Sequence, residues 1–314
     1  MARKKRSETP PDPRDAADTS KAVVYALGAN FAIAITKYVA AAITGSGSMF
    51  AEAVHSTADC GNQLLLLLGL KLSRRPPTPD YPMGFGKETY FWSFVVAIML
   101  FTVGGMFSIY EGWHKLNEPE PLDKPFIALG VLAFGLVAES FSMFGALREV
   151  NKLRRGANLW RWFRQSRNSE LVVIFGEDLA ALVGLALAFV AVLATWVTGN
   201  PLWDALGGIA IGVLLVIVAV AVAVEVKAML IGQGVEPAVR AQMVEFLSAQ
   251  PAVEKVLDLI TLHFGGDVMV AVKAKLRPQG DLDALVDAIN AIEAAFKDRF
   301  PETQWIFFEP DNAR

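Results

Sequence analysis

Long apolar runs separated by short polar loops make up the first three quarters of the chain. Each run holds about 20 or more residues, the length that an α-helix needs to cross about 30 Å of hydrocarbon. The runs lie near residues 22–44, 48–72, 91–115, 126–150, 171–198 and 202–230. We therefore predict an all-α bundle of six transmembrane helices.

The pattern changes after residue 230. Residues 236–250 and 281–299 have the periodicity of amphipathic helices, while 253–263, 267–277 and 303–308 alternate like strands, the first two joined by the turn FGGD. In VMVAVKAKL, Lys273 and Lys275 share one face, and Val272, Ala274 and Leu276 share the other. The order αββαβ resembles a ferredoxin-like α+β fold without its first strand.

These patterns predict three parts. Residues 1–20 are basic and then rich in Pro and Asp, and no apolar region follows within the distance that a cleavable signal requires, so we expect a disordered basic tail. Residues 21–231 form the six-helix transmembrane domain, and residues 232–314 form the C-terminal cytoplasmic domain. Because 54% of the chain is hydrophobic and only 19% is charged, a membrane protein fits the composition better than a soluble one.

Basic residues are distributed unevenly between the two sides of the predicted bundle. With both termini on one side, that side receives the loop 148–167, which holds seven Lys and Arg residues, and the following basic residues: Arg3, Lys4, Lys5, Arg6, Arg14, Lys21, Lys71, Arg74, Arg75 and Lys87. The opposite side carries only Lys115 and Lys124. The positive-inside rule therefore predicts cytoplasmic termini, and we expect a multi-pass protein of a bacterial inner membrane.

The second apolar run, AEAVHSTADCGNQLLLLLGL, begins with polar residues. Glu52, His55, Asp59 and Asn62 are spaced by 3, 4 and 3 residues, so they form one stripe on a helix. Ionisable groups inside a span cost about 2.5–3.5 kcal/mol each on insertion scales, so they persist chiefly where they pair or bind something. The single cysteine, Cys60, lies in the same run and is expected to be a small buried residue.

A histidine and a carboxylate four residues apart present a nitrogen and an oxygen to one point, which is half of a tetrahedral metal site. The other half must come from another helix. The fifth run, LVVIFGEDLAALVGLALAF, holds Glu177 and Asp178, and we expect one of the two to face the site because neighbours on a helix point about 100° apart. The alternative is that these groups only form hydrogen bonds and ion pairs between helices.

Three other polar residues stand in or beside the spans. Lys37 and Glu139 are lone charges in the first and fourth runs, and we expect structural partners or snorkelling side chains. Asp204, at the start of the sixth run, either caps that helix or guides an ion.

Together, the stretches SGSMFAEAVHSTADCGNQ, YPMGFGKETYFWSF and NPLWDALGGIAIG resemble the cation diffusion facilitator family, and within it most closely the zinc transporter nine subgroup. The resemblance implies a homodimer that exports Zn²⁺ from the cytoplasm in exchange for protons. It also implies that His55 and Asp59 are the ligands of the second helix, and that Asp178, by its distance to Gly184, is the aspartate of the fifth.

The chain departs from that family in two places. A histidine is usual four residues before Asp178, where this chain has Ile174, so the fourth ligand is Glu177, Asn62 or water. An oxygen-rich set weakens the preference for Zn²⁺ over Mn²⁺, Fe²⁺ or Co²⁺. In the cytoplasmic domain, metal-binding positions of some members are replaced by Lys273, Phe307 and Glu309. We expect that domain to dimerise rather than store metal, and His263, which has no clustered partners, to be a surface or turn residue.

The ligand types suggest a mechanism. Metal binds unprotonated imidazole, so metal and protons compete for His55. A transport-impaired scaffold or regulatory protein is the main alternative. A protein of transporter ancestry that no longer transports metal would be expected to lose a metal ligand, such as the histidine that is missing here. A channel fits poorly, since a filter needs a ring of donors. We find no phosphate-binding loop and no nucleophile elbow, so we expect neither an enzyme nor a nucleic-acid partner.

Overall fold

The computed structural model describes residues 30–312, except 120, 121, 123, 155 and 157. The expected tail 1–20 and the neighbouring Lys21 lie outside the described residues. The first eight residues of the predicted first span also lie outside them.

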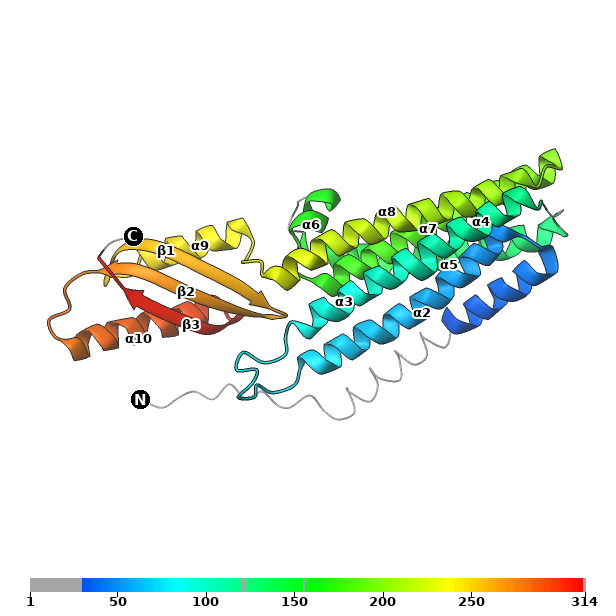
Figure 1. Ribbon diagram of the computed structural model, residues 1–314. Coiled ribbons are helices and arrows are strands. Elements are labelled where there is room, and N and C mark those ends of the chain that lie inside the picture. The colour runs from blue at the N-terminus through cyan, green and yellow to red at the C-terminus, as the bar shows by residue number, and fades with distance from the viewer. Residues whose placement is uncertain (1–29, 120–121, 123, 155, 157, 313–314) are drawn as a thin grey trace. The chain divides into compact units, whose positions relative to one another are not determined.

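The helices follow the apolar runs closely. They are the helix Asn30–Thr44, α2 (Gly47–Ser73), α3 (Glu88–Met99), η1 (Leu100–Met106), α4 (Phe107–Asn117), α5 (Pro125–Leu153), α6 (Leu159–Gln165), α7 (Ser169–Thr198) and α8 (Leu202–Ile231) (Figure 1). Within the described part of the chain, four stretches are long and apolar enough to cross a membrane: Glu88–Asn117, Pro125–Leu153, Ser169–Thr198 and Leu202–Ile231. A helical membrane bundle is therefore confirmed, while the count of six spans stays a prediction.

The third apolar run contains a π-helical turn, η1, which joins α3 to α4. Such turns insert one residue into an α-helix. Helix α8 packs closely beside it: a Cβ on Gly105 would lie 2.6 Å from Cγ2 of Val216, and a Cβ on Gly212 would lie 2.7 Å from the carbonyl oxygen of Gly105. Glycine at both positions is therefore what permits this contact.

The loop that we predicted over 148–167 is wrong in part. Helix α5 continues to Leu153, and residues Leu159–Gln165 form the short helix α6. Asn158 begins α6, because its side chain accepts a hydrogen bond of 2.7 Å from the amide of Arg161. Trp162 is buried, and the Arg164 guanidinium lies 3.2 Å from the Glu225 carboxylate.

The chain divides into two compact units. Unit 1 comprises the described part of Met1–Leu64 together with Met99–Phe141 and Ala180–Val216. Unit 2 comprises Leu65–Ile98, Ser142–Leu179 and Ile217–Arg314 as far as residue 312.

The last part of unit 2 contains a three-stranded sheet and two helices (Figure 1). The elements are α9 (Pro237–Ser248), β1 (Val253–Phe264), β2 (Asp267–Leu276), α10 (Leu282–Arg299) and β3 (Thr303–Pro310). The sheet order is β1-β2-β3, with β2 antiparallel to β1 and parallel to β3. The predicted order αββαβ is confirmed, and the long crossover through α10 is what a parallel pair requires.

Alternation along β2 explains why helices cover one face of this sheet. Val268, Val270, Val272 and Ala274 are buried in one cluster with Met243 and Leu247 of α9 and Ile292 and Phe296 of α10. The residues between them point the other way: Lys273 lies 2.7 Å from Asp311, and Lys275 lies 2.7 Å from Glu254. The predicted two faces of the strand are therefore confirmed.

Candidate functional site

The polar stripe of α2 lies in unit 1. The side chains of Glu52, His55 and Asn62 are fully buried, and Asp59 is 19% exposed. Their common orientation follows from the spacing of three or four residues on an α-helix.

His55 and Asp59 face each other without forming a hydrogen bond. Nδ1 of His55 lies 3.5 Å from Oδ1 of Asp59. Among the described residues, neither ring nitrogen of His55 nor this oxygen of Asp59 has a hydrogen-bond partner. Buried polar atoms in folded proteins almost always have one, so an unpaired imidazole beside a carboxylate calls for an explanation. Both groups are ligands of divalent metals, so a cation held between them would give these atoms a partner.

Two charged residues from other helices surround this pair within unit 1. Lys37 forms an ion pair with Glu52, so its predicted role as a structural partner is confirmed. Glu139 of α5 interacts electrostatically with both His55 and Asp59. We had assigned Glu139 a structural or snorkelling role, and its only signal in the sequence was a lone acid within an apolar run. Its position adds a second carboxylate near Asp59 and strengthens the attraction for a cation.

The acidic pair of α7 lies in unit 2. Glu177 is buried, whereas Asp178 is half-buried and accepts a hydrogen bond of 3.2 Å from the hydroxyl of Ser142 on α5. Ile174 is 39% exposed. Glu177 is thus the more deeply buried of the two acids, as the angle of about 100° between helical neighbours allows.

Across the described ranges of the chain, no three His, Cys, Asp or Glu side chains come close enough together to hold a metal ion. His55 and Asp59 belong to unit 1, and Glu177 and Asp178 belong to unit 2. The convergence of the two pairs on one ion stays a prediction.

Asp204 of α8 holds the beginning of α2. Its carboxylate accepts hydrogen bonds from the hydroxyl of Ser46 at 2.7 Å, the amide of Gly47 at 2.5 Å, the amide of Ser48 at 3.3 Å and the hydroxyl of Ser48. A carboxylate at a helix N-terminus is stabilised by the free N–H groups and the helix dipole. We had expected Asp204 to cap its own helix or to guide an ion, and it caps a different helix instead. It thereby fixes the start of the helix that carries His55 and Asp59.

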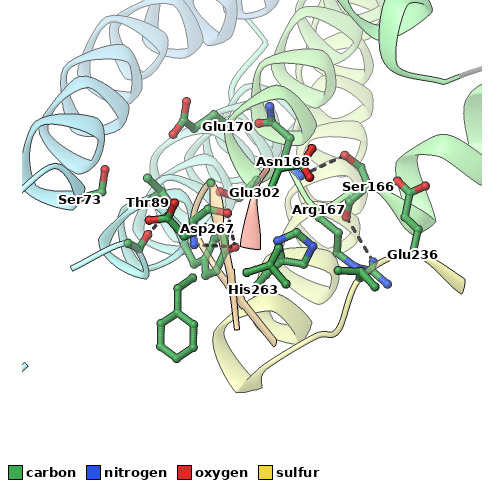
Figure 2. A pocket seen from close by; sticks show the side chains of 18 of the residues that line it. Ser73, Thr89, Ser166, Arg167, Asn168, Glu170, Glu236, His263, Asp267 and Glu302 are labelled. Atoms are coloured by element: carbon green, nitrogen blue, oxygen red, sulfur yellow. Dashed lines mark hydrogen bonds between the residues drawn. The ribbon is translucent and has the colours of Figure 1, made fainter. Parts of the chain in front are cut away.

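Unit 2 contains a second candidate, a pocket of about 750 Å³. Figure 2 shows His263, Asp267, Glu302 and Arg167 among its lining residues, which come from the β1–β2 hairpin, the start of β3 and the segment before α7. His263 is half-buried near the end of β1, beside the hairpin turn, where we predict a surface or turn residue. Both acidic and basic side chains line this pocket, so its composition does not indicate a site for either a cation or an anion.

The tip of the β1–β2 hairpin docks beside this pocket. The Tyr90 hydroxyl donates to the carbonyl of Gly265 at 3.2 Å and accepts from its amide at 3.0 Å. A Cβ on Gly86 would lie 2.2 Å from the carbonyl oxygen of Phe264, so only glycine permits this approach. The hairpin is thus fastened to the start of α3 by backbone contacts.

His263 makes the stability of the folded protein depend on pH. Burial, and then the nearby charge of Arg167, lower the pKa of His263 below its ordinary value of 6.5. The folded protein therefore binds this proton more weakly than the unfolded chain does, and the contribution of neutral His263 to stability is lost as the pH falls below 6.5. We expect the unfolding temperature of the purified protein to fall between about pH 7 and about pH 5, and His263→Gln to reduce the slope of unfolding temperature against pH.

His114→Gln is the matched control because the His114 side chain is 55% exposed. Equal slopes in the parent and in His263→Gln would refute this prediction.

Comparisons with known proteins find a matching family model and several similar relatives. The family model of the cation efflux transmembrane domain matches residues 23–231. The proton-coupled zinc antiporter SLC30A9, mitochondrial, of Xenopus laevis is 33% identical over 288 residues, or 88% of this chain and 51% of the relative. Metal tolerance protein C4 of Arabidopsis thaliana is 31% identical over 242 residues, or 76% of this chain and 53% of the relative. Zinc transporter ZitB of Escherichia coli is 22% identical over 273 residues, or 87% of this chain and 82% of the relative. The chain spans about half the length of the frog and Arabidopsis relatives.

Proposed function

The chain belongs to the cation diffusion facilitator family, in the zinc transporter nine-like subgroup, and on that premise we propose that it exchanges a divalent metal ion for protons across a membrane. Zn²⁺ is the first substrate that we propose, in keeping with the names of the frog and Escherichia coli relatives. The observation that carries the proposal is the buried His55, whose ring nitrogens have no hydrogen-bond partner among the described residues and which lies 3.5 Å from Asp59.

We propose that the ion is held by His55 and Asp59 from α2 and by Asp178 from α7, with Glu177 as the fourth ligand. This set has one nitrogen and several oxygens, so Mn²⁺, Fe²⁺ and Co²⁺ are alternative substrates. Glu177 is proposed as the fourth ligand because its carboxylate is the more deeply buried of the two neighbouring acids on α7.

Protons are coupled to metal through His55 in this mechanism. Metal loads onto the unprotonated imidazole from the side where the ion is taken up. On the other side, a proton binds the imidazole, weakens its hold on the metal and returns with the empty carrier. Exchange follows because one nitrogen binds either the metal or the proton.

The protein is an integral membrane protein, and we propose that both of its termini lie on the side from which metal is exported. Lys71 in the last turn of α2, and Arg74 and Arg75 in the loop that follows, support this orientation, because basic residues concentrate at the cytoplasmic side. We expected a bacterial inner membrane. The frog relative is named as mitochondrial, so the corresponding side in an organelle is the alternative.

We propose the division into a membrane domain at 21–231 and a ferredoxin-like domain at 232–314, with homodimerisation through the latter. The sheet face opposite α9 and α10 supports this use, because it carries the exposed apolar residues Ile260 on β1 and Phe307 on β3, which both pair with Ala271 of the central strand β2. Exposed apolar residues in a patch are typical of protein–protein contacts.

A scaffold or regulatory protein without transport is the second candidate. It is favoured by Ile174, which stands where a ligand is usual in the family and is 39% exposed. Proteoliposomes with an imposed pH gradient separate the two functions. We expect gradient-driven uptake of Zn²⁺ by the parent protein. No gradient-driven uptake of Zn²⁺, Mn²⁺, Fe²⁺ or Co²⁺ would favour the scaffold.

The fourth ligand can be tested by Glu177→Gln, which keeps the size of the side chain but removes its charge. We expect the affinity of the purified protein for Zn²⁺ to fall about tenfold, because a neutral amide is a poorer ligand than a carboxylate. Glu149→Gln is the control, since Glu149 is 55% exposed and pairs with Lys152 on the same helix. Unchanged affinity in Glu177→Gln would remove Glu177 from the site.

A further inference from the structure

Lys37 is a fully buried ammonium within unit 1. Only 1% of the Lys37 surface is exposed. Nζ donates a hydrogen bond of 2.7 Å to the hydroxyl of Ser56 and lies 3.3 Å from Oε2 of Glu52. A buried lysine is rare unless it is paired, and here both partners come from one helix, α2. Lys37 therefore ties the helix Asn30–Thr44 to the polar stripe.

Both partners of Lys37 stand within one helical turn of the proposed metal ligands. Ser56 follows His55 directly, and Glu52 precedes His55 by three residues. Lys37 and Glu52 interact electrostatically with His55, and Lys37 also interacts with Asp59. Glu52 is thus an acid on the same face as His55 and Asp59, but one that already has a cation of its own.

Glu52 is also confined on its other side. Among residues that the structure describes, Oε1 of Glu52 has no hydrogen-bond partner. A Cβ added to Gly184 of α7 would lie 2.6 Å from this oxygen. The carboxylate therefore lies between the Lys37 ammonium and the backbone of α7, and the space that it occupies exists because residue 184 is glycine.

We propose that Lys37 is a specificity-determining, positioning residue: it holds Glu52 back from the ion bound at His55 and Asp59. This inference rests on the proposed function. While Lys37 holds Glu52 away, the ion is coordinated by few ligands, which suits the four-coordinate geometry of Zn²⁺. With Glu52 released, the site gains a further carboxylate oxygen, and oxygen-rich sites of higher coordination suit Mn²⁺.

A purely structural role for Lys37 makes a different prediction. If Lys37 only neutralised Glu52, its loss would change the affinity for every divalent ion by a similar factor, because all carry the same charge. The ratio of Zn²⁺ to Mn²⁺ affinity cancels that common factor. It changes only if the set of ligands changes.

The test measures Zn²⁺ and Mn²⁺ affinities of the purified full chain by competition with a chromogenic chelator. We expect Lys37→Met to lower the Zn²⁺ to Mn²⁺ affinity ratio about tenfold, the scale on which groups around a metal site act. Lys37→Arg keeps the ion pair and should keep the parent ratio. In Lys37→Met with Glu52→Gln, the released side chain is no longer a carboxylate, so the ratio should return to that of the parent.

Ser56→Ala provides a second route that leaves Lys37 in place. It removes the 2.7 Å hydrogen bond of the ammonium, so we expect a smaller shift of the ratio in the same direction. Thr57→Ala is the matched control, since Thr57 is the next hydroxyl on the helix and is exposed. If Lys37→Met fails to fold, Ser56→Ala decides the outcome.

Two results would overturn the inference, and they differ. An unchanged ratio in Lys37→Met, or in Ser56→Ala where the former does not fold, would show that Lys37 does not set selectivity, while the proposed function stands. Failure of the parent protein to bind either ion would remove the metal site itself, and the proposed function would fall together with the inference.

Discussion

Replacement of Asp59 by alanine should abolish gradient-driven metal uptake in proteoliposomes, and Asp178→Ala should do the same. Loss of a group that merely supports a metal ligand already costs about 10–100-fold in affinity, so loss of a ligand should cost at least about a hundredfold. The side chain of Asp59 is 19% exposed and lies 3.5 Å from His55, so Asp59→Ala removes the carboxylate that faces the imidazole.

Controls separate this effect from a general loss of structure. Asp59→Asn preserves the size of the side chain and should still abolish uptake, because the negative charge is what the ion requires. Asp298→Ala changes an exposed acid on α10 and should leave uptake at the parent rate. Uptake by Asp59→Ala at the parent rate would exclude Asp59 as a ligand.

Asp204→Ala should lower the stability of the protein strongly. The change leaves two hydroxyls and two amides at Ser46, Gly47 and Ser48 without their acceptor. Each buried donor left unpaired costs about 1–3 kcal/mol, so together they should cost at least about 3 kcal/mol of unfolding free energy. Thermal unfolding of the purified protein in detergent measures the loss.

The same variant connects stability to transport. Without Asp204, the start of α2 is free to shift, and His55 and Asp59 lie two to three turns along that helix, so Zn²⁺ affinity should also fall. Ser46→Ala removes one of the four hydrogen bonds and should have a smaller effect on both quantities. An Asp204→Ala protein that unfolds at the parent temperature would show that this cap does not hold α2.

Most helices and strands could be predicted from the sequence because their patterns are local. The apolar runs end where the helices end to within a few residues, and the alternation in β2 shows which face is covered. The helix α6 could not be recognised so easily. Its residues are mixed in character, and Trp162 becomes a core residue only through packing against Phe175 of α7, with ring centroids 5.6 Å apart.

The same distinction between local pattern and tertiary packing applies to the functional site. The stripe with His55 and Asp59 follows from helical spacing, so it could be found without a structure. The partners of Lys37 and of Asp204 lie on other helices, and helix packing decides which groups meet. His263 likewise looked isolated in the sequence, yet Figure 2 shows it in the wall of a pocket. The prediction that α2 and α7 bind one ion together likewise depends on helix packing and not on a local sequence pattern.

The central claim is that one imidazole and several carboxylates hold the transported ion inside the membrane. X-ray absorption at the zinc edge of the purified, zinc-loaded protein tests it most directly, because imidazole, carboxylate and thiolate ligands give distinct signatures. We predict a single imidazole nitrogen at about 2.0–2.1 Å with carboxylate oxygens at about 2.0–2.2 Å, and loss of the imidazole signal in His55→Gln. A shell containing sulfur, or an imidazole signal that persists unchanged in His55→Gln, would contradict the account.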